Sequence, residues 1–142
     1  MNIQPYVYFD GRCEEAVAFY QQALGAKVVM LMHYRDAPSD SAGDCNGPPP
    51  PADKVMHGCL QIGESQVLVS DGFAKGQPEF KGISLSLTAA SDAEARRLFD
   101  ALAAGGQVQM PLGPSFFASS FGMLTDRFGV AWMIIAGVKS MG

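Results

Sequence analysis

Two stretches of this chain share one pattern: Glu15-Ala16-Val17-Ala18-Phe19-Tyr20-Gln21-Gln22-Ala23-Leu24-Gly25-Ala26 and Glu94-Ala95-Arg96-Arg97-Leu98-Phe99-Asp100-Ala101-Leu102-Ala103-Ala104-Gly105. In each stretch the apolar residues recur at the spacing of an amphipathic helix. Each stretch ends in small residues and glycine, which favour the end of a helix. Strand-like runs precede and follow both stretches, so the sequence predicts two copies of one module with the order β-α-β-β-β.

The first module is predicted to occupy residues 1–71, with its helix running from about residue 13 to residue 24. Aromatic and β-branched residues predict four strands. Residues 36–53 contain Pro48-Pro49-Pro50-Pro51 and predict a long, partly polyproline-like loop between the second and third strands. The four predicted strands cover residues 5–9, 28–34, 55–62 and 66–70.

The second module is predicted to occupy residues 82–142, after a glycine- and proline-containing linker at 72–81. Ser91 is a suitable N-cap, and Glu94 three residues later completes a capping box at the start of the second helix, which ends near residue 104. The predicted strands cover residues 83–88, 108–112, 121–125 and 130–136. The resulting fold class is α+β, with two curved mixed sheets that face each other around a cleft. Clefts between repeated units are frequent ligand sites.

Composition excludes several classes of function. Of the 142 residues, 48% are hydrophobic, so the chain is expected to fold as a globular protein. The net charge of −4 argues against a nucleic-acid or anionic-membrane partner. No apolar run reaches the roughly 18 residues that span a bilayer, and no signal peptide pattern opens the chain. We therefore expect a cytoplasmic protein.

The cysteines fit neither a disulfide framework nor a zinc pattern. The chain has three of them, Cys13, Cys45 and Cys59, at wide spacing. Cys13 lies at a predicted helix start, where the pKa of a thiol can fall and its reactivity rise. The other interpretation is a small buried residue in a reducing compartment.

Strand alternation predicts which residues line the cleft, because successive side chains point to opposite faces. Leu60 and Ile62 are expected to pack on the first helix. His57, Cys59 and Gln61 are then expected to share the opposite face of that strand. In the second module the apolar residues of the strand at 83–88 are expected to face the helix. The predicted ligand-binding residues of the cleft are His57, Gln61, Ser84, Ser86 and Met133.

His57 is the candidate catalytic residue. An imidazole titrates near neutral pH and can act as a general base. The alternative is that His57 forms a hydrogen bond across the cleft and only shapes it. Ser84 and Ser86 have no Asp-His relay to activate them, and the Gly-x-Ser-x-Gly motif of hydrolases is missing.

The element order, with three further segments, resembles the vicinal oxygen chelate superfamily, which includes glyoxalase I, extradiol dioxygenases, and bleomycin and fosfomycin resistance proteins. The segments are Tyr8-Phe9-Asp10-Gly11-Arg12-Cys13-Glu14-Glu15-Ala16, the hairpin from Met56-His57-Gly58 to Ser70-Asp71, and Thr125-Asp126-Arg127-Phe128-Gly129-Val130-Ala131-Trp132-Met133. Within the superfamily they are similar to the PhnB-like subgroup, which is also described as 3-demethylubiquinone-9 3-methyltransferase-like. No glycine-rich strand-turn-helix supports methyl transfer.

The resemblance implies a divalent metal held by His, Glu or Gln from the first and last strands of each module. The matching positions in this chain carry poor ligands for such a cation, and shifting the register by one residue does not yield three ligands. We therefore predict that the metal site of the superfamily is absent, and that no cofactor is bound. The matching positions are Pro5 or Gln4, Val69, Gly82 or Ser84, and Met133.

Three functions follow as hypotheses. The first is a metal-free protein that binds a small, partly apolar molecule. The second is a divalent-metal-dependent lyase, isomerase or dioxygenase that acts on a small oxygen-rich substrate. The third is a protein whose cleft is filled by its own side chains and whose role is association. Sheet edges that need cover, and the pairing common in the superfamily, also predict a homodimer.

Overall fold

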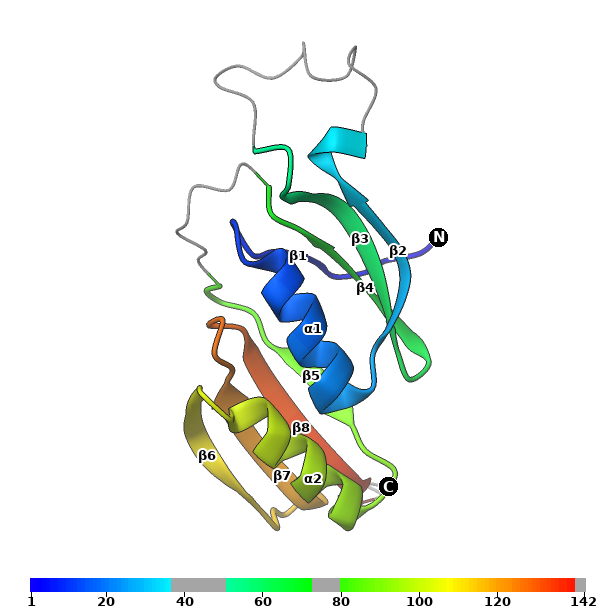
Figure 1. Ribbon diagram of the computed structural model, residues 1–142. Coiled ribbons are helices and arrows are strands. Elements are labelled where there is room, and N and C mark those ends of the chain that lie inside the picture. The colour runs from blue at the N-terminus through cyan, green and yellow to red at the C-terminus, as the bar shows by residue number, and fades with distance from the viewer. Residues whose placement is uncertain (37–50, 73–79, 140–142) are drawn as a thin grey trace. The chain divides into compact units, whose positions relative to one another are not determined.

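The computed structural model describes residues 1–36, 51–72 and 80–139 (Figure 1). The chain divides into two compact units, Met1–Pro78 and Glu79–Gly142. Most of the predicted proline-rich loop at 36–53 and most of the predicted linker at 72–81 lie outside the described residues.

The first unit is a four-stranded mixed sheet with one long helix. The strand order is β1-β4-β3-β2, in which β1 is parallel to β4 and the other neighbours are antiparallel. The helix α1 lies against the sheet (Figure 1). The elements are β1 (Tyr6–Tyr8), α1 (Cys13–Leu24), β2 (Lys27–His33), a 3-10 helix (Tyr34–Asp36), β3 (Val55–Ile62) and β4 (Ser65–Ser70).

The second unit repeats this topology. Its strand order is β5-β8-β7-β6, with β5 parallel to β8 and the other neighbours antiparallel. The predicted α+β class and the twofold β-α-β-β-β order are confirmed. The elements are β5 (Leu85–Thr88), α2 (Asp92–Ala103), β6 (Gln107–Gly113), β7 (Ala118–Thr125) and β8 (Ala131–Val138).

Both helices begin and end for local reasons. Gly25 adopts the left-handed conformation after α1, and its N–H bonds to the carbonyl of Gln21 at 3.1 Å. At the start of α2 the Ser91 hydroxyl accepts a hydrogen bond from the N–H of Glu94 at 3.1 Å. The Glu94 carboxylate accepts from the N–H of Ala90 at 2.9 Å, one residue earlier than in the usual capping box.

Each sheet buries one face against its helix. In both units a glycine makes room on that face: a Cβ at Gly58 would lie 2.9 Å from Leu31 and Val69, and a Cβ at Gly122 would lie 2.8 Å from Phe99. The side chains around these positions form the core of each unit. They include Val7, Leu60 and Val69 with Ala16, Val17 and Tyr20, and Leu124, Trp132 and Ile134 with Leu98, Phe99 and Leu102.

Asp71 is a buried carboxylate that follows β4 directly and is 1% exposed. Its Oδ1 accepts hydrogen bonds from the backbone N–H of Gly11 at 2.7 Å and of Cys13 at 2.8 Å. Its Oδ2 accepts from the N–H of Val55 at 2.8 Å. One side chain therefore joins the turn after β1, the start of α1 and the start of β3.

We predict that Asp71→Asn lowers the free energy of unfolding by about 3 kcal/mol. The amide nitrogen of asparagine cannot accept a hydrogen bond, so at least one buried N–H loses its partner. Urea denaturation measures the change. The matched control is Asp100→Asn, which alters an exposed i,i+4 pair with Arg96 and is expected to change stability by less than about 0.5 kcal/mol. Equal stability losses in the two variants would contradict this role of Asp71.

Candidate functional site

The side of the first sheet that faces away from α1 is called here the open face. Gly58, Leu60 and Val69 lie on the helix side, so their strand neighbours point to the open face. The prediction that His57, Cys59 and Gln61 share a face opposite Leu60 is consistent with this register. Cross-strand pairing places the following residues on the open face: Tyr6, Tyr8, Lys27, Met30, Met32, His57, Cys59, Gln61, Gln66, Leu68 and Ser70.

Tyr6 and His57 form a hydrogen-bonded pair at the centre of the open face. The Tyr6 hydroxyl lies 2.8 Å from Nδ1 of His57, and the ring of Tyr6 stacks on that of Tyr8 with 4.9 Å between the centroids. Burial raises the pKa of the Tyr6 phenol above its ordinary value, and the neighbouring Tyr8 raises it further. Tyr6 therefore stays neutral at physiological pH, and its hydroxyl donates to Nδ1 in one tautomer of His57 and accepts from Nδ1–H in the other.

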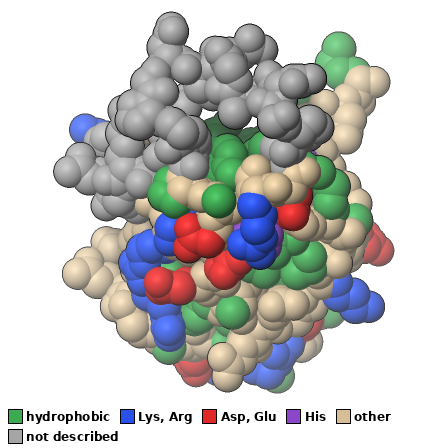
Figure 2. Space-filling view, turned by 45° about the horizontal axis from the view of Figure 1, so that its top comes forward, with side chains coloured by type: hydrophobic (Ala, Val, Ile, Leu, Met, Phe, Trp, Pro, Cys, Tyr) green, Lys and Arg blue, Asp and Glu red, His purple; other side chains and the backbone are tan. Residues whose placement is uncertain are grey.

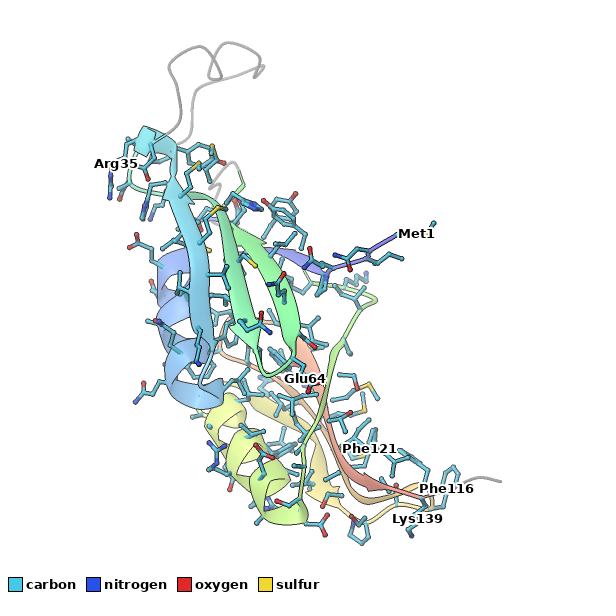
Figure 3. The ribbon with its side chains drawn as sticks, turned by 90° about the vertical axis from the view of Figure 1, so that its right-hand side faces the viewer. Met1, Arg35, Glu64, Phe116, Phe121 and Lys139 are labelled. Carbon is cyan, nitrogen blue, oxygen red and sulfur yellow. The ribbon has the colours of Figure 1, made fainter. Side chains whose placement is uncertain are left out.

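Gln61 belongs to a chain of side-chain amides along the same face. Gln4 donates to Gln66 at 2.8 Å, and Gln66 donates to the Gln61 carbonyl at 3.1 Å. The Gln61 amide nitrogen donates to the carbonyl of Gly63 at 2.9 Å, in the β3–β4 turn that carries Glu64 (Figure 3). These bonds orient the Gln61 amide, so a ligand would meet a fixed polar group there.

The predicted residues of the second module lie on the second sheet or beside it. Ser86 pairs with Met133, and both point away from α2. Phe121 lies on the same side (Figure 3). The strand β5 begins at Leu85, two residues later than predicted, so Ser84 precedes the strand and is exposed. The predicted cleft between the two sheets stays a prediction.

The two histidines lie on opposite sides of the first sheet. Nε2 of His33 contacts the Glu14 carboxylate on α1, and Nδ1 of His33 lies 3.7 Å from Asp36. His57 instead points to the open face with Tyr6. Within residues 1–36, 51–72 and 80–139, no group of three or more His, Cys, Asp or Glu side chains could hold a metal ion.

The positions that match the superfamily's metal ligands do not fit a divalent cation. Val69 pairs with Gly58 and points to the helix side, so the residue expected in that slot does not even reach the open face. Its neighbours Leu68 and Ser70 do reach that face, but neither is a carboxylate or an imidazole. Met133 supplies a thioether, which is a poor ligand for a hard cation.

Cys13 is a buried residue at the start of α1. Burial raises the pKa of its thiol strongly, and the Asp71 carboxylate raises it further. The helix start therefore does not activate this thiol, and of the two interpretations the structure favours the small buried residue. Cys59 is also a free thiol, and Cys45 lies outside the described residues.

The surface carries no segregated charge on the face drawn in Figure 2, where acidic and basic side chains are interspersed. Among the helices that the structure describes, none is long and apolar enough to cross a membrane.

The family model of 3-demethylubiquinone-9 3-methyltransferase matches residues 1–135. Protein YjdN of Escherichia coli K12 is 36% identical over 138 residues, which cover 94% of each chain.

Solved structures show the same fold. Protein PA1353 from Pseudomonas aeruginosa is 46% identical with a TM-score of 0.80, over 96% of this chain and 98% of that one. A putative 3-demethylubiquinone-9 3-methyltransferase, PhnB protein, from Bacillus cereus is 27% identical with a TM-score of 0.77, over 96% and 100%. A glyoxylase/bleomycin resistance protein/dioxygenase domain from Frankia sp. EAN1pec, 14% identical over 99% and 94%, shares the fold with a TM-score of 0.65.

The raised pKa of Tyr6 predicts how stability depends on alkaline pH. Its contribution is fully present below the ordinary tyrosine pKa of about 10 and is lost as the pH rises through the higher folded-state pKa. We expect the free energy of unfolding to fall less steeply above about pH 10 in Tyr6→Phe than in the unmodified protein. Denaturation at a series of pH values measures this, and parallel curves would contradict it.

Proposed function

The chain belongs to the 3-demethylubiquinone-9 3-methyltransferase family, which includes PhnB-like proteins, and from this premise we propose that it binds a small, partly apolar molecule on the open face of the first sheet. The observation that carries the proposal is the hydrogen-bonded pair of Tyr6 and His57 beside the stacked ring of Tyr8. Aromatic rings provide apolar area, and the imidazole and amides fix the orientation of a bound molecule.

The chemistry of the open face indicates the class of ligand. Tyr6 and Tyr8 are 38% and 54% exposed, so their rings offer apolar area to a ligand. The polar groups around them are hydroxyl, imidazole and amide groups. Among the described residues assigned above to the open face, the charged one is Lys27, the first residue of β2. A small, uncharged molecule with an aromatic or other flat apolar part suits this face better than a phosphate or a polycation.

The family's description names a methyltransferase, but the architecture favours binding over methyl transfer. Nucleotide-type cofactors are usually held where a glycine-rich turn joins adjacent parallel strands through a helix. Here α1 connects β1 to β2, and these strands lie at opposite edges of the sheet. The ligand is proposed to bind without a divalent metal, because the matching positions fit none.

A second candidate is an enzyme in which His57 is the general base. It is favoured by the tautomer in which Nδ1–H of His57 donates to the Tyr6 hydroxyl oxygen, because that bond orients the imidazole and leaves Nε2 unprotonated for a substrate proton. In this case His57 would contact the reacting group, whereas in a binding protein it would only orient the ligand. The two functions therefore share one site and differ in whether the bound molecule changes.

We expect native mass spectrometry of the purified protein to reveal a small organic mass released on denaturation. Once that compound is identified, Tyr8→Leu and His57→Ala should each weaken its binding at least tenfold, or about 1.4 kcal/mol, because they remove a ring and a polar contact. Arg97→Ala, at an exposed position of α2, is the matched control for a change away from the open face.

Each outcome of this experiment separates the candidates. Unchanged affinity in both open-face variants would place the ligand elsewhere and overturn the proposal. Conversion of the compound by the unmodified protein, lost in His57→Ala while binding persists, would establish the enzyme instead of the binding protein.

We also propose that the chain forms a homodimer through the edge strand β2. Val28, Val29 and Met30 are exposed there, at 39%, 57% and 37%, and β2 is the last strand of its sheet. An uncovered edge strand is a template for pairing with a second chain. The edge strand β6 also carries exposed apolar residues, but it contains Pro111, which cannot donate a backbone hydrogen bond and protects that edge.

Val29→Lys is expected to shift the protein from dimer to monomer in sedimentation experiments, because a charge on the edge opposes pairing. The matched control is Val138→Lys, which places the same charge at an exposed position, 64% accessible, at the end of the interior strand β8. A monomeric unmodified protein, or a dimer that survives Val29→Lys, would contradict this proposal.

A further inference from the structure

Two thioethers, a thiol and an imidazole occupy adjacent positions of the open face, on the neighbouring strands β2 and β3. Met30 pairs directly with Cys59, and Met32 pairs directly with His57. The irregularities of the β2–β3 ladder lie outside this part, between Val28 and Met30 and between Met32 and His33. Two thioethers, one thiol and one imidazole therefore occupy the four corners of a single patch.

The spacing of this patch suits one metal ion. Directly paired residues of antiparallel strands have Cβ atoms about 5 Å apart, and residues two apart on one strand are about 7 Å apart. An ion above the centre of such a rectangle lies about 5 Å from each Cβ, which a methionine sulfur or a histidine Nε2 spans with a metal bond of about 2 Å. The shorter cysteine side chain draws the ion toward Cys59.

The patch has a nearly buried thiol on one strand and an exposed thioether on the next. Cys59 is a free thiol and is 8% exposed, while Met30 is 37% exposed at the edge of the sheet. In the tautomer in which Nδ1–H of His57 donates to the Tyr6 hydroxyl oxygen, Nε2 is the unprotonated nitrogen left for a ligand bond. Histidines that bind metals commonly use their second nitrogen in this way, in a hydrogen bond that fixes the ring.

We propose that this patch binds Cu(I), a function separate from the ligand binding proposed above. Thiolate and thioether donors select Cu(I) over the harder divalent ions. Binding forms a bond from Cu(I) to the Cys59 sulfur and releases the thiol proton to solvent, so the ion and its ligands together are neutral. The site differs from the superfamily's divalent site in position and in donor type.

Comparison with a second row of methionines shows how much the thiol and the imidazole contribute to Cu(I) affinity. Met110, Met123 and Met133 pair with one another across β6, β7 and β8, on the side of the second sheet away from α2. Their neighbour on β5 is Ser86, which is not a soft donor. This row supplies thioethers alone, so it is expected to bind Cu(I) more weakly than the patch on the first sheet.

The test is a competition for Cu(I) under anaerobic conditions, with the coloured Cu(I)–bicinchoninate complex as the probe. The reference protein carries Cys45→Ser, so that this thiol does not contribute. We expect the reference to remove one Cu(I) per chain. Cys59→Ser, and separately Met30→Leu with Met32→Leu, should each lower the affinity at least tenfold.

The test needs a matched control variant and a measurement of folding. Met110→Leu with Met123→Leu changes the same residue type on the second sheet and should leave the affinity within about twofold, since Met-to-Leu exchanges conserve volume. Far-UV circular dichroism confirms that each variant is folded. No Cu(I) uptake by the reference, or equal affinity in the Met30/Met32 and Met110/Met123 variants, would overturn the proposal.

The methionine variants keep this test separate from the proposed small-molecule function. They leave Tyr6, Tyr8 and His57 intact, so ligand binding through those residues should persist when Cu(I) binding is lost. Conversely, Tyr8→Leu should lose ligand binding and keep normal Cu(I) uptake.

Discussion

The first unit depends on one buried carboxylate. Its β1 strand is short and pairs in parallel with β4, and a parallel pair cannot be closed by a tight hairpin. Asp71, directly after β4, holds the N–H groups of Gly11, Cys13 and Val55. These groups belong to the turn after β1, the start of α1 and the start of β3. The carboxylate therefore fixes β1 beside β4. That placement brings Tyr6 within hydrogen-bonding distance of His57 across β4.

The second unit uses the same physical device at a different place. Asp126, 3% exposed in the turn between β7 and β8, accepts hydrogen bonds from the N–H groups of Phe128 and Val130 and from the indole N–H of Trp132. In both units a carboxylate satisfies several buried donors where regular pairing stops, which removes the cost of leaving them without partners. The two modules repeat their topology, but this stabilising interaction moves from the end of the last strand to the turn before it.

Structural features that depend on residues close together in the sequence could be predicted. The bounds of α1 follow from the apolar spacing of its residues and from Gly25, and alternation along β3 placed His57 opposite Leu60. The role of Asp71 could not be predicted, because its partners are distant in sequence and an aspartate before a glycine also reads as a turn residue. The resemblance to the superfamily matches Val69 to a ligand position, but the register with Gly58 turns this side chain to the helix side. The pairing of Tyr6 with His57 likewise required the strand order, which the sequence does not specify.

The open face combines two kinds of recognition on one imidazole. Tyr6 occupies Nδ1 of His57, which leaves Nε2 as the group that faces a ligand. On the β1 side lie the tyrosine rings, which favour a flat apolar molecule, and on the β2 side lie Met30, Met32 and Cys59, which favour a soft ion. Both occupants need the same nitrogen, so occupation by one weakens the other by mass action. A small molecule that itself carries a soft donor would avoid this competition, because it could bridge the rings and the ion.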